Sequence, residues 1–274
     1  MPELPEVETI VRNLREGHHG PPLQGQRFER VSLYWPRHIY TPSPSTFRRR
    51  IKGRIVQEVG RRGKFVHIQL DHGNLIIHLR MSGDLSVVPK ETPRDLHDHT
   101  IFFLENSYQF RFNDVRKFGQ VYLVDDAQEI FEKLGPEPLD PDFTAQSLTR
   151  NLQKRKRQIK PLLLDQTFLA GLGNIYTDEA LHLAGIHPLR RSDTLDEDEV
   201  HALWKGIRSA LENGIIHNGA SIDWVYRGGE FQNHFRVYQR TGEACETCGS
   251  TIERAVIGQR GTHFCPHCQP EAST

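Results

Sequence analysis

The spacing of the four cysteines constrains the fold of this chain more than any other feature. They form the pattern Cys245-x2-Cys248-x16-Cys265-x2-Cys268, and the chain has no other cysteine. Two such pairs at this spacing are typical of a hairpin whose thiolates hold one zinc ion in a tetrahedron. Two disulfides are the alternative, but disulfides are rare in cytosolic proteins. Because four sulfurs close the coordination shell, we predict one structural Zn²⁺ ion and no catalytic metal.

The charge of the chain is balanced overall but unevenly distributed. The 274 residues have a net charge of zero, which argues against a uniformly basic nucleic-acid binder. However, residues 48–64 hold eight basic side chains against one acid, Glu58, and residues 150–160 hold six basic side chains against none. Each run could be an ordinary solvated face. Together they favour a local positive field within a neutral protein.

Length and hydrophobic patterning indicate two domains of α+β class. Short segments rich in β-forming residues follow one another between about residues 27 and 124, which favours antiparallel sheets in a sandwich or barrel. The strands expected there are 65–70, 75–81, 85–88, 100–104, 108–112 and 120–124. No run approaches about 18 apolar residues, and no signal-peptide pattern is present, so we expect a cytosolic protein that does not enter membranes.

The second half of the chain has a helical pattern. Residues 135–143 contain three prolines and read as a linker between domains. The helices expected after it are 144–154, 158–169, 174–184 and 195–213. Asp193, or Thr194 three residues before Glu197, is the expected N-cap of the last helix. From Val237 onward the pattern returns to strands and turns around the cysteines.

The first residues, Met1-Pro2-Glu3, are suited to amine chemistry. If Met1 is removed, Pro2 becomes a secondary amine whose pKa lies near the usual α-amino range of about 7.7–8.0. Such an amine can attack a sugar or carbonyl carbon and form a covalent iminium. Part of the segment also reads as a helix start, because Pro5 suits a first turn and Val7, Ile10, Val11 and Leu14 recur at helical spacing.

Six segments, in order along the chain, resemble the bacterial formamidopyrimidine-DNA glycosylase family. They are Pro-Glu-Leu-Pro-Glu-Val-Glu at 2–8, His-Leu-Arg-Met-Ser-Gly at 78–83, Asn-Asp-Val-Arg-Lys-Phe-Gly at 113–119, Leu-Gly-Pro-Glu-Pro-Leu at 134–139, Gly-Leu-Gly-Asn-Ile-Tyr at 171–176 and the four-cysteine motif. The resemblance implies an 8-oxoguanine DNA glycosylase and abasic-site lyase of base-excision repair. The Pro-Glu-Leu-Pro start, in place of the Pro-Glu-Gly-Pro of the endonuclease VIII branch, favours purine lesions.

The resemblance also implies the domain plan. It comprises an N-terminal β-sandwich flanked by helices at 1–134, a linker at 135–144, a helical domain with a helix-two-turn-helix motif at 145–235, and a zinc finger hairpin at 236–274. The expected partner is double-stranded DNA containing oxidised purines or abasic sites. We expect a monomer in the bacterial cytosol, associated with the nucleoid when it acts. The stretch 217–236 would close over the extruded base, and here it is short, with side chains that differ from those of other members.

The resemblance assigns catalytic roles to four residues. Pro2 would be the nucleophile at C1′ of the damaged nucleotide, and Glu3 would serve the sugar ring oxygen and later proton transfers. Glu6 would hold the helix start and Pro2 in place, and Lys64 would contact phosphate and assist elimination.

It also assigns contacts with DNA. Met81, Arg116 and Phe118 would enter the base stack when the damaged nucleotide is extruded, although Met81 and Phe118 could instead be core residues. The other implied DNA-contacting residues are His78, His97, Lys117, Lys156, Asn174 and Arg260.

Two other functions fit part of the sequence. A binder of damaged or distorted DNA without chemistry would share the basic runs and the zinc hairpin, but it would not need Pro2, Glu3, Glu6 and Lys64. An enzyme using an N-terminal proline on small carbonyl compounds would need neither the zinc hairpin nor the basic runs.

Overall fold

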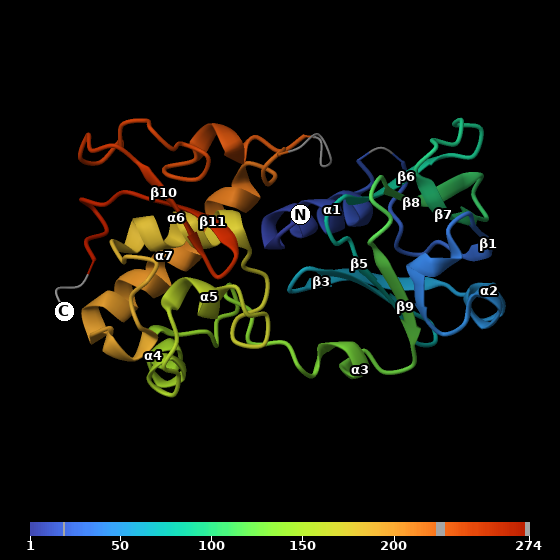
Figure 1. The fold of residues 1–274 in the computed structure, drawn as a ribbon. Coiled ribbons are helices and arrows are strands. Elements are labelled where there is room, and N and C mark those ends of the chain that lie inside the picture. Colours follow the sequence, from blue (N-terminus) through green and yellow to red (C-terminus); the bar gives the residue numbers. More distant parts are fainter. Residues whose placement is uncertain (19, 223–227, 272–274) are drawn as a thin grey trace. The chain divides into compact units, whose positions relative to one another are not determined.

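The computed structural model describes residues 1–18, 20–222 and 228–271 (Figure 1). The chain folds into two compact units. The first contains residues 1–132 and 220–229, and the second contains residues 133–219 and 230–274. Part of the stretch 217–236, residues 223–227, lies outside the described residues. No helix in the described ranges is both long enough and apolar enough to cross a bilayer.

The first unit is a β-sandwich. One sheet has the order β1 (Phe28–Leu33), β7 (Asp98–Leu104), β8 (Tyr108–Asp114) and β6 (Gly83–Pro89), with antiparallel neighbours. The other has the order β2 (Ile39–Thr41), β9 (Gln120–Val124), β5 (Asn74–His78), β4 (Phe65–Leu70) and β3 (Val56–Arg62). The sandwich confirms the predicted fold class. The pairing in both sheets is antiparallel, as expected, except that the short β2, which was not predicted, pairs with β9 in parallel.

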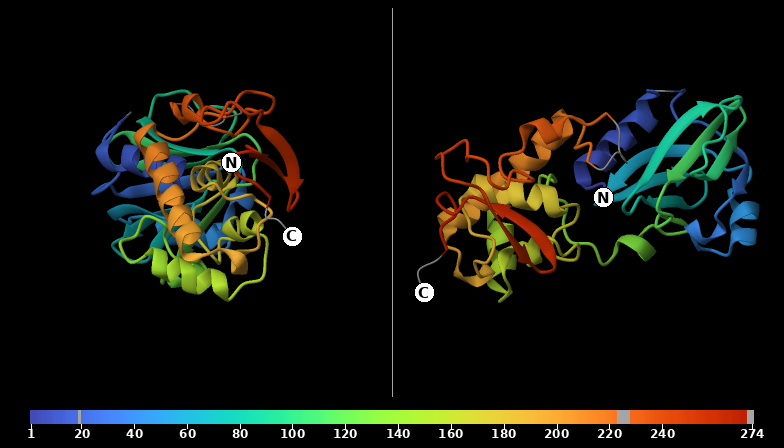
Figure 2. Two further views of the ribbon diagram at one scale, coloured as in Figure 1. Left: turned by 90° about the vertical axis from the view of Figure 1, so that its left-hand side faces the viewer. Right: turned by 45° about the horizontal axis from the view of Figure 1, so that its top comes forward.

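Two helices close the edges of this sandwich. Helix α1 (Leu4–Glu16) packs against β3 and β6, which are edge strands of the two sheets. Helix α2 (Pro44–Ile51) packs against β1 and β2, which are the opposite edges. Covering an edge removes a template for pairing with another chain. The views in Figure 2 show α1, in dark blue, alongside the strands. A short helix, α3 (Gln128–Phe131), follows β9.

The core of the first unit lies between the sheets. Phe102 and Phe110 of the four-stranded sheet stack with ring centroids 5.2 Å apart, and Val66 and Ile77 of the five-stranded sheet join the same buried cluster. The predicted apolar stripe of α1, which includes Val7, completes this core.

The strand expected at 75–81 ends early. β5 stops at His78, because Arg80 adopts a left-handed conformation (φ 56°) and its N–H bonds to Nδ1 of His78 at 3.0 Å. The strand expected at 85–88 starts earlier, because β6 begins at Gly83. Met81 therefore lies on the turn between these strands and not within a strand.

The second unit contains four α-helices in its described part: α4 (Ala145–Gln153), α5 (Ile159–Leu163), α6 (Asn174–Ala184) and α7 (Glu197–Ile216). Helices α6 and α7 pack together, α4 packs on α7, and the hairpin of β10 (Glu253–Ile257) and β11 (Arg260–Phe264) lies against α6. Figure 2 shows this red hairpin beside the yellow α6. Single turns of 3₁₀-helix occur at Pro36–His38, Ser192–Thr194 and Phe231–His234.

Two predicted helices have different bounds. The helix expected at 158–169 ends at Leu163, because the Asp165 carboxylate accepts hydrogen bonds from the N–H and hydroxyl of Thr167 and starts a turn. The helix expected at 195–213 runs from Glu197 to Ile216. Its N-cap is Asp196, in a capping box with Glu199, so the prediction of Asp193 or Thr194 as N-cap was wrong.

Candidate functional site

The start of α1 buries two carboxylates beside Pro2. Glu3 and Glu6 are only 3% and 2% exposed, and Pro2 is buried as well. Oε2 of Glu6 accepts a hydrogen bond from the N–H of Glu3 at 2.8 Å, and Oε1 accepts one from the N–H of Ala220 at 2.7 Å. The Glu6 carboxylate thus fixes the backbone immediately after Pro2. Burying a carboxylate is costly, and these two N–H donors offset part of that cost.

Pro2 carries the Met1 peptide in this structure. Its nitrogen is therefore an amide nitrogen, and it becomes an amine only when Met1 is removed. Met1 is 46% exposed, whereas Pro2 is buried.

Lys64 lies on the tight turn between β3 and β4. The turn is held by Arg61, which donates to the carbonyl of Gly63 at 3.0 Å and to Oε2 of Glu8 on α1 at 2.9 Å. Lys64 itself is only 5% exposed. The turn that carries this lysine is thereby attached to the helix that begins at the buried carboxylates.

His78 lies next to Lys64, because Phe65 pairs with His78 across β4 and β5. Burial, together with the nearby charges of Arg80 and Lys64, lowers the pKa of His78 to about 3. The ring is neutral at physiological pH, and its Nδ1 accepts the N–H of Arg80. The proton must then be on Nε2, so His78 can offer one neutral N–H donor to a ligand.

Asp114 anchors the two turns that carry Met81, Arg116 and Phe118, which we call the wedge residues. Its fully buried carboxylate accepts hydrogen bonds from the Ser82 hydroxyl, from the N–H of Arg116 at 3.2 Å and from the N–H of Gly119 at 2.7 Å. Nε2 of His38 lies 3.3 Å from its Oδ2. Burial raises the pKa of Asp114, but the hydrogen bonds from His38, Ser82 and Gly119 outweigh burial and leave that pKa below its ordinary value.

The side chains on these two turns point to solvent. Met81 is 37% and Phe118 is 52% exposed, so the alternative that they are core residues is excluded. The Arg116 guanidinium carbon lies 5.1 Å from the centroid of the Phe118 ring.

The backbone around these turns is closely packed. Gly119 has no room for a side chain, because a Cβ would lie 2.2 Å from the Phe112 ring. The structure therefore brings Met81, Arg116 and Phe118 onto adjoining turns, since Gly83 pairs with Asp114.

In the second unit, Asn174 and Arg260 belong to elements that are joined by buried polar contacts. Asn174 is the first residue of α6, and its Nδ2 donates to the carbonyl of Gly261 at 2.9 Å. The buried Lys160 ammonium also donates to this carbonyl, at 3.1 Å, and lies 2.6 Å from Oδ1 of Asp178. Oδ2 of Asp178 accepts the N–H of His263 at 2.9 Å. This network attaches the hairpin turn with the exposed Arg260 to α6.

The four cysteines fit a zinc ion. Their Sγ atoms all lie within 4.8 Å of one another, and all four are free of disulfides. The Cys245–Cys268 and Cys248–Cys265 pairs have sulfur separations of 3.9 and 3.4 Å. A tetrahedron with zinc–sulfur bonds of about 2.3 Å places its sulfurs about 3.8 Å apart. The hairpin therefore binds one structural Zn²⁺ ion, as predicted.

Two further predicted DNA-contacting residues lie in segments between helices and strands. His97 is half-buried before β7, where its carbonyl accepts the N–H of Asp114 at 3.0 Å and its ring meets that of His99. Lys156 is exposed in the segment between α4 and α5.

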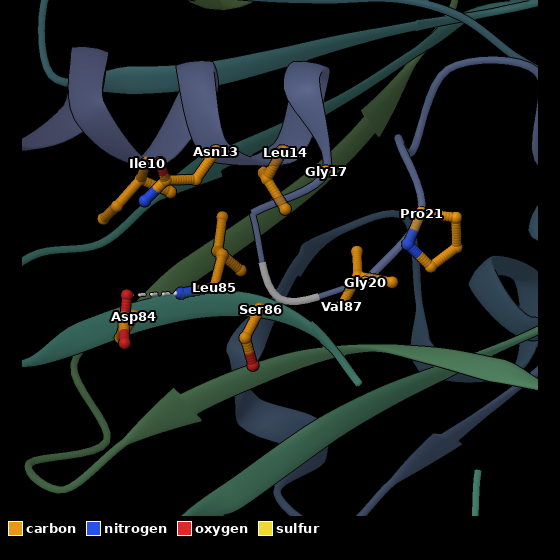
Figure 3. A pocket seen from close by; sticks show the side chains of 10 residues that line it. All are labelled: Ile10, Asn13, Leu14, Gly17, Gly20, Pro21, Asp84, Leu85, Ser86 and Val87. Carbon is orange, nitrogen blue, oxygen red and sulfur yellow. Dashed lines mark hydrogen bonds between the residues drawn. The ribbon is translucent and has the colours of Figure 1, made fainter. Parts of the chain in front are cut away.

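Two pockets in the described part of the chain lie apart from the predicted residues. A small cleft of about 80 Å³ lies between the second half of α1 and β6, lined by residues such as Asn13, Leu14 and Ser86 (Figure 3). A pocket of about 390 Å³ in the second unit is lined by residues such as Asn213, His217 and Arg236. None of the sequence-predicted site residues lines either one.

Sequence reasoning missed three organising residues. Asp114 belongs to the segment 113–119. The Asn and Asp at its start are typical of turns, and this could have indicated that Asp114 organises one. Lys160 read as one more basic residue of a surface run, yet it is fully buried. No sequence pattern indicated a role for Gln166. Its Nε2 donates hydrogen bonds to the carbonyls of Leu164 and Leu172 and so holds the loop before α6.

Three family models match the chain. The formamidopyrimidine-DNA glycosylase N-terminal domain matches residues 1–121, the formamidopyrimidine-DNA glycosylase H2TH domain matches residues 134–225, and a zinc finger found in FPG and IleRS matches residues 242–270.

Whole-chain relatives agree with these domains. The formamidopyrimidine-DNA glycosylase of Herpetosiphon aurantiacus is 46% identical over 98% of this chain and 100% of its own length, and that of Chloroflexus aurantiacus is 46% identical over 98% of each. Solved structures of MutM with DNA containing carbocyclic 8-oxo-G, and of the Lactococcus lactis enzyme with FAPY-dG DNA, are each 38% identical, have TM-scores of 0.90, and match 98% of this chain and 100% of theirs. The chain belongs to the formamidopyrimidine-DNA glycosylase family.

Proposed function

We propose that this protein is a base-excision repair enzyme that removes oxidised purines from duplex DNA and then cleaves the abasic site. The observation that carries the proposal is the buried start of α1, where Glu6 fixes the backbone between Pro2 and Glu3. Solved relatives bind DNA containing 8-oxo-G, FAPY-dG or an abasic site, which supports the same substrate class here.

The first step proposed is attack of the Pro2 amine on C1′ of the damaged nucleotide, once Met1 is removed. A bond forms between the Pro2 nitrogen and C1′, and the glycosidic bond breaks. The base leaves with its bonding electron pair and takes up a proton. Opening of the sugar ring then leaves an iminium between Pro2 and C1′, and loss of a C2′ proton expels the 3′ phosphate.

The neighbouring groups have distinct proposed roles. Glu3 protonates the sugar ring oxygen and takes part in the later proton transfers, and Glu6 positions it through the backbone. Lys64 supplies a positive charge to the phosphate beside the lesion. His78 lies beside Lys64 and is neutral, and it donates its Nε2–H to the sugar-phosphate backbone of the DNA.

The proposed DNA contacts divide into two sets. Met81, Arg116 and Phe118 fill the space left by the extruded nucleotide, which offsets the few kcal/mol of unstacking. Phosphate contacts come from the other predicted residues, which are His97, Lys117, Lys156, Asn174 and Arg260. The zinc hairpin holds Arg260 on α6 through Gly261. We also propose that the protein acts as a monomer in the bacterial cytosol, at the nucleoid.

Cleavage of defined duplexes tests this function. Protein with a mature N-terminus should cut duplexes containing 8-oxoguanine, formamidopyrimidine or an abasic site and leave undamaged duplex intact. Glu3→Gln should lower base excision by at least about 100-fold, as expected for loss of a general acid. Glu16→Gln, an exposed position on the same helix, should not change it. Tight binding of these duplexes without cleavage would show a DNA-binding protein and overturn the proposal.

A further inference from the structure

Trp35 lies beside the turn that carries Arg116 and Phe118. Its ring contacts two cationic side chains, Lys117 and Arg37. The N–H groups of Tyr34 and Trp35 both donate to the carbonyl of His99, at 2.8 and 3.3 Å, which fastens this segment to β7. Nζ of Lys117 lies 4.7 Å from the centroid of the Trp35 ring, and Cζ of Arg37 lies 5.3 Å from it. Both distances are within the range of a cation–π contact.

The cations on this surface lack carboxylate partners. Within the described ranges, Arg37, Arg116 and Lys117 form no ion pair, and all three are exposed. Other arginines of the same unit are paired, such as Arg61 with Glu8 and Arg111 with Asp98. Two like charges that share one ring repel each other, and an anion placed between them relieves that repulsion.

The position of Lys117 indicates which anion this is. Lys117 lies between Arg116 and Phe118 in the chain, and Phe118 is the exposed ring proposed to enter the base stack. A duplex that receives Phe118 must carry its sugar-phosphate backbone past the same turn. The phosphates of that backbone then pass Lys117, and next to it the indole ring and Arg37.

We propose that Arg37 is a further DNA-phosphate ligand and that Trp35 is a positioning residue, which holds Lys117 for the same backbone. This inference rests on the proposed function, because it needs a duplex seated on the wedge. The contact is independent of sequence, since it reads a phosphate and not a base.

The salt dependence of binding tests the role of Arg37. Affinity for a duplex with a tetrahydrofuran abasic analogue is measured between about 50 and 200 mM KCl. Arg37→Ala and Arg37→Gln should each reduce the slope of log Kd against log salt by about 0.9, the loss expected for one phosphate contact. Arg37→Lys should keep the slope. Lys90→Ala, an exposed cation after β6 and outside both basic runs, is the matched control and should keep it too.

A double-mutant cycle tests the role of Trp35. Trp35→Leu should weaken binding by about 2- to 5-fold, the usual strength of an exposed cation–π contact. In a Lys117→Ala background the loss should be smaller, because only the contact of Trp35 with Arg37 remains to be removed. Thermal unfolding of each variant confirms that the fold is retained.

The two proposals fail in different ways. Wild-type protein that shows no salt-dependent binding to this duplex would overturn both the proposed function and this inference. Normal wild-type binding with an unchanged slope in Arg37→Ala and Arg37→Gln would overturn the role of Arg37 alone. An equal loss from Trp35→Leu in both backgrounds would overturn the positioning role of Trp35.

Discussion

The backbone N–H of Ala220 donates a hydrogen bond to Oε1 of Glu6 at 2.7 Å, although 214 residues separate them. The other oxygen of the same carboxylate accepts the N–H of Glu3. One buried side chain therefore joins the helix start that follows Pro2 to the beginning of the segment 220–229. In our proposal this couples the position of the nucleophile to the segment expected to close over the extruded base.

Replacing Glu6 with Gln should damage both stability and activity. A carboxamide has one acceptor oxygen, so the N–H of either Glu3 or Ala220 is left buried without its partner. The free energy of unfolding should fall by about 1–3 kcal/mol. Urea unfolding measures this loss, and abasic-site cleavage measures the effect on activity. Glu16→Gln is the control on the exposed face of α1 and should change neither. A fully stable and active Glu6→Gln protein would contradict the bridging role.

Asp114→Asn should loosen the wedge while leaving the sandwich folded. An amide cannot accept all the hydrogen bonds that Ser82, Arg116 and Gly119 donate to this carboxylate. We expect slower extrusion of the damaged nucleotide, read by the fluorescence of 2-aminopurine placed beside the lesion. Ser82→Ala removes one donor and should have a smaller effect. If Asp114→Asn extrudes the nucleotide at the wild-type rate, the carboxylate does not organise these turns.

The buried imidazole of His78 should make the protein less stable in mild acid. Its pKa is about 3 in the folded state against 6.5 for an ordinary histidine. Between these values the unfolded chain binds a proton that the folded chain does not. The stability contributed by neutral His78 is therefore present above about pH 6.5 and declines as the pH falls, by up to about 1.4 kcal/mol per pH unit.

Urea unfolding at about pH 7 and 5 tests this, because His78→Gln should show a shallower loss than the wild type. His99, His182 and His187 also have lowered pKa values, so part of the slope should remain in the variant. NMR detection of His78 protonation near pH 6.5 in the folded protein would contradict the assignment.

The ion pair between Lys160 and Asp178 should be essential to the second unit. Both side chains are fully buried, and Asp178 also accepts the N–H of His263. Asp178→Asn leaves the lysine charge buried without its counter-charge, which should cost about 3–5 kcal/mol. Thermal unfolding and zinc content per chain measure the outcome. Asp193→Asn, in the exposed pair with Arg191, is the control and should leave both unchanged. Equal stability of the two variants would show that the buried pair contributes little.

Local patterns in the sequence were enough to predict several elements. The cysteine spacing predicted the zinc site, and the apolar stripe of α1 was visible at helical spacing. The sequence left open whether Met81 is a core residue, and its exposure in the structure decided this. The N-cap of α7 was missed because two similar patterns overlap, Thr194 to Glu197 and Asp196 to Glu199, and only the second forms the capping box.

Contacts between distant residues could not be predicted in this way. Ser82 and Asp114 are 32 residues apart, and their pairing depends on the register of β6 against β8. Lys160 reads as a surface residue until the hairpin 101 residues later covers it. Strand β2 has only three residues, too few for an alternating pattern, and its parallel pairing with β9 is a property of the tertiary fold.

Borohydride reduction tests the central claim most directly. Protein with a mature N-terminus is mixed with a duplex containing 8-oxoguanine, reduced, and analysed by intact mass and peptide mapping. The account predicts one covalent DNA adduct per chain, attached to the nitrogen of Pro2 in a peptide that lacks Met1. Protein that retains Met1 should form none, because its Pro2 nitrogen is an amide. An adduct on another residue, or no adduct with the mature protein, would contradict the account.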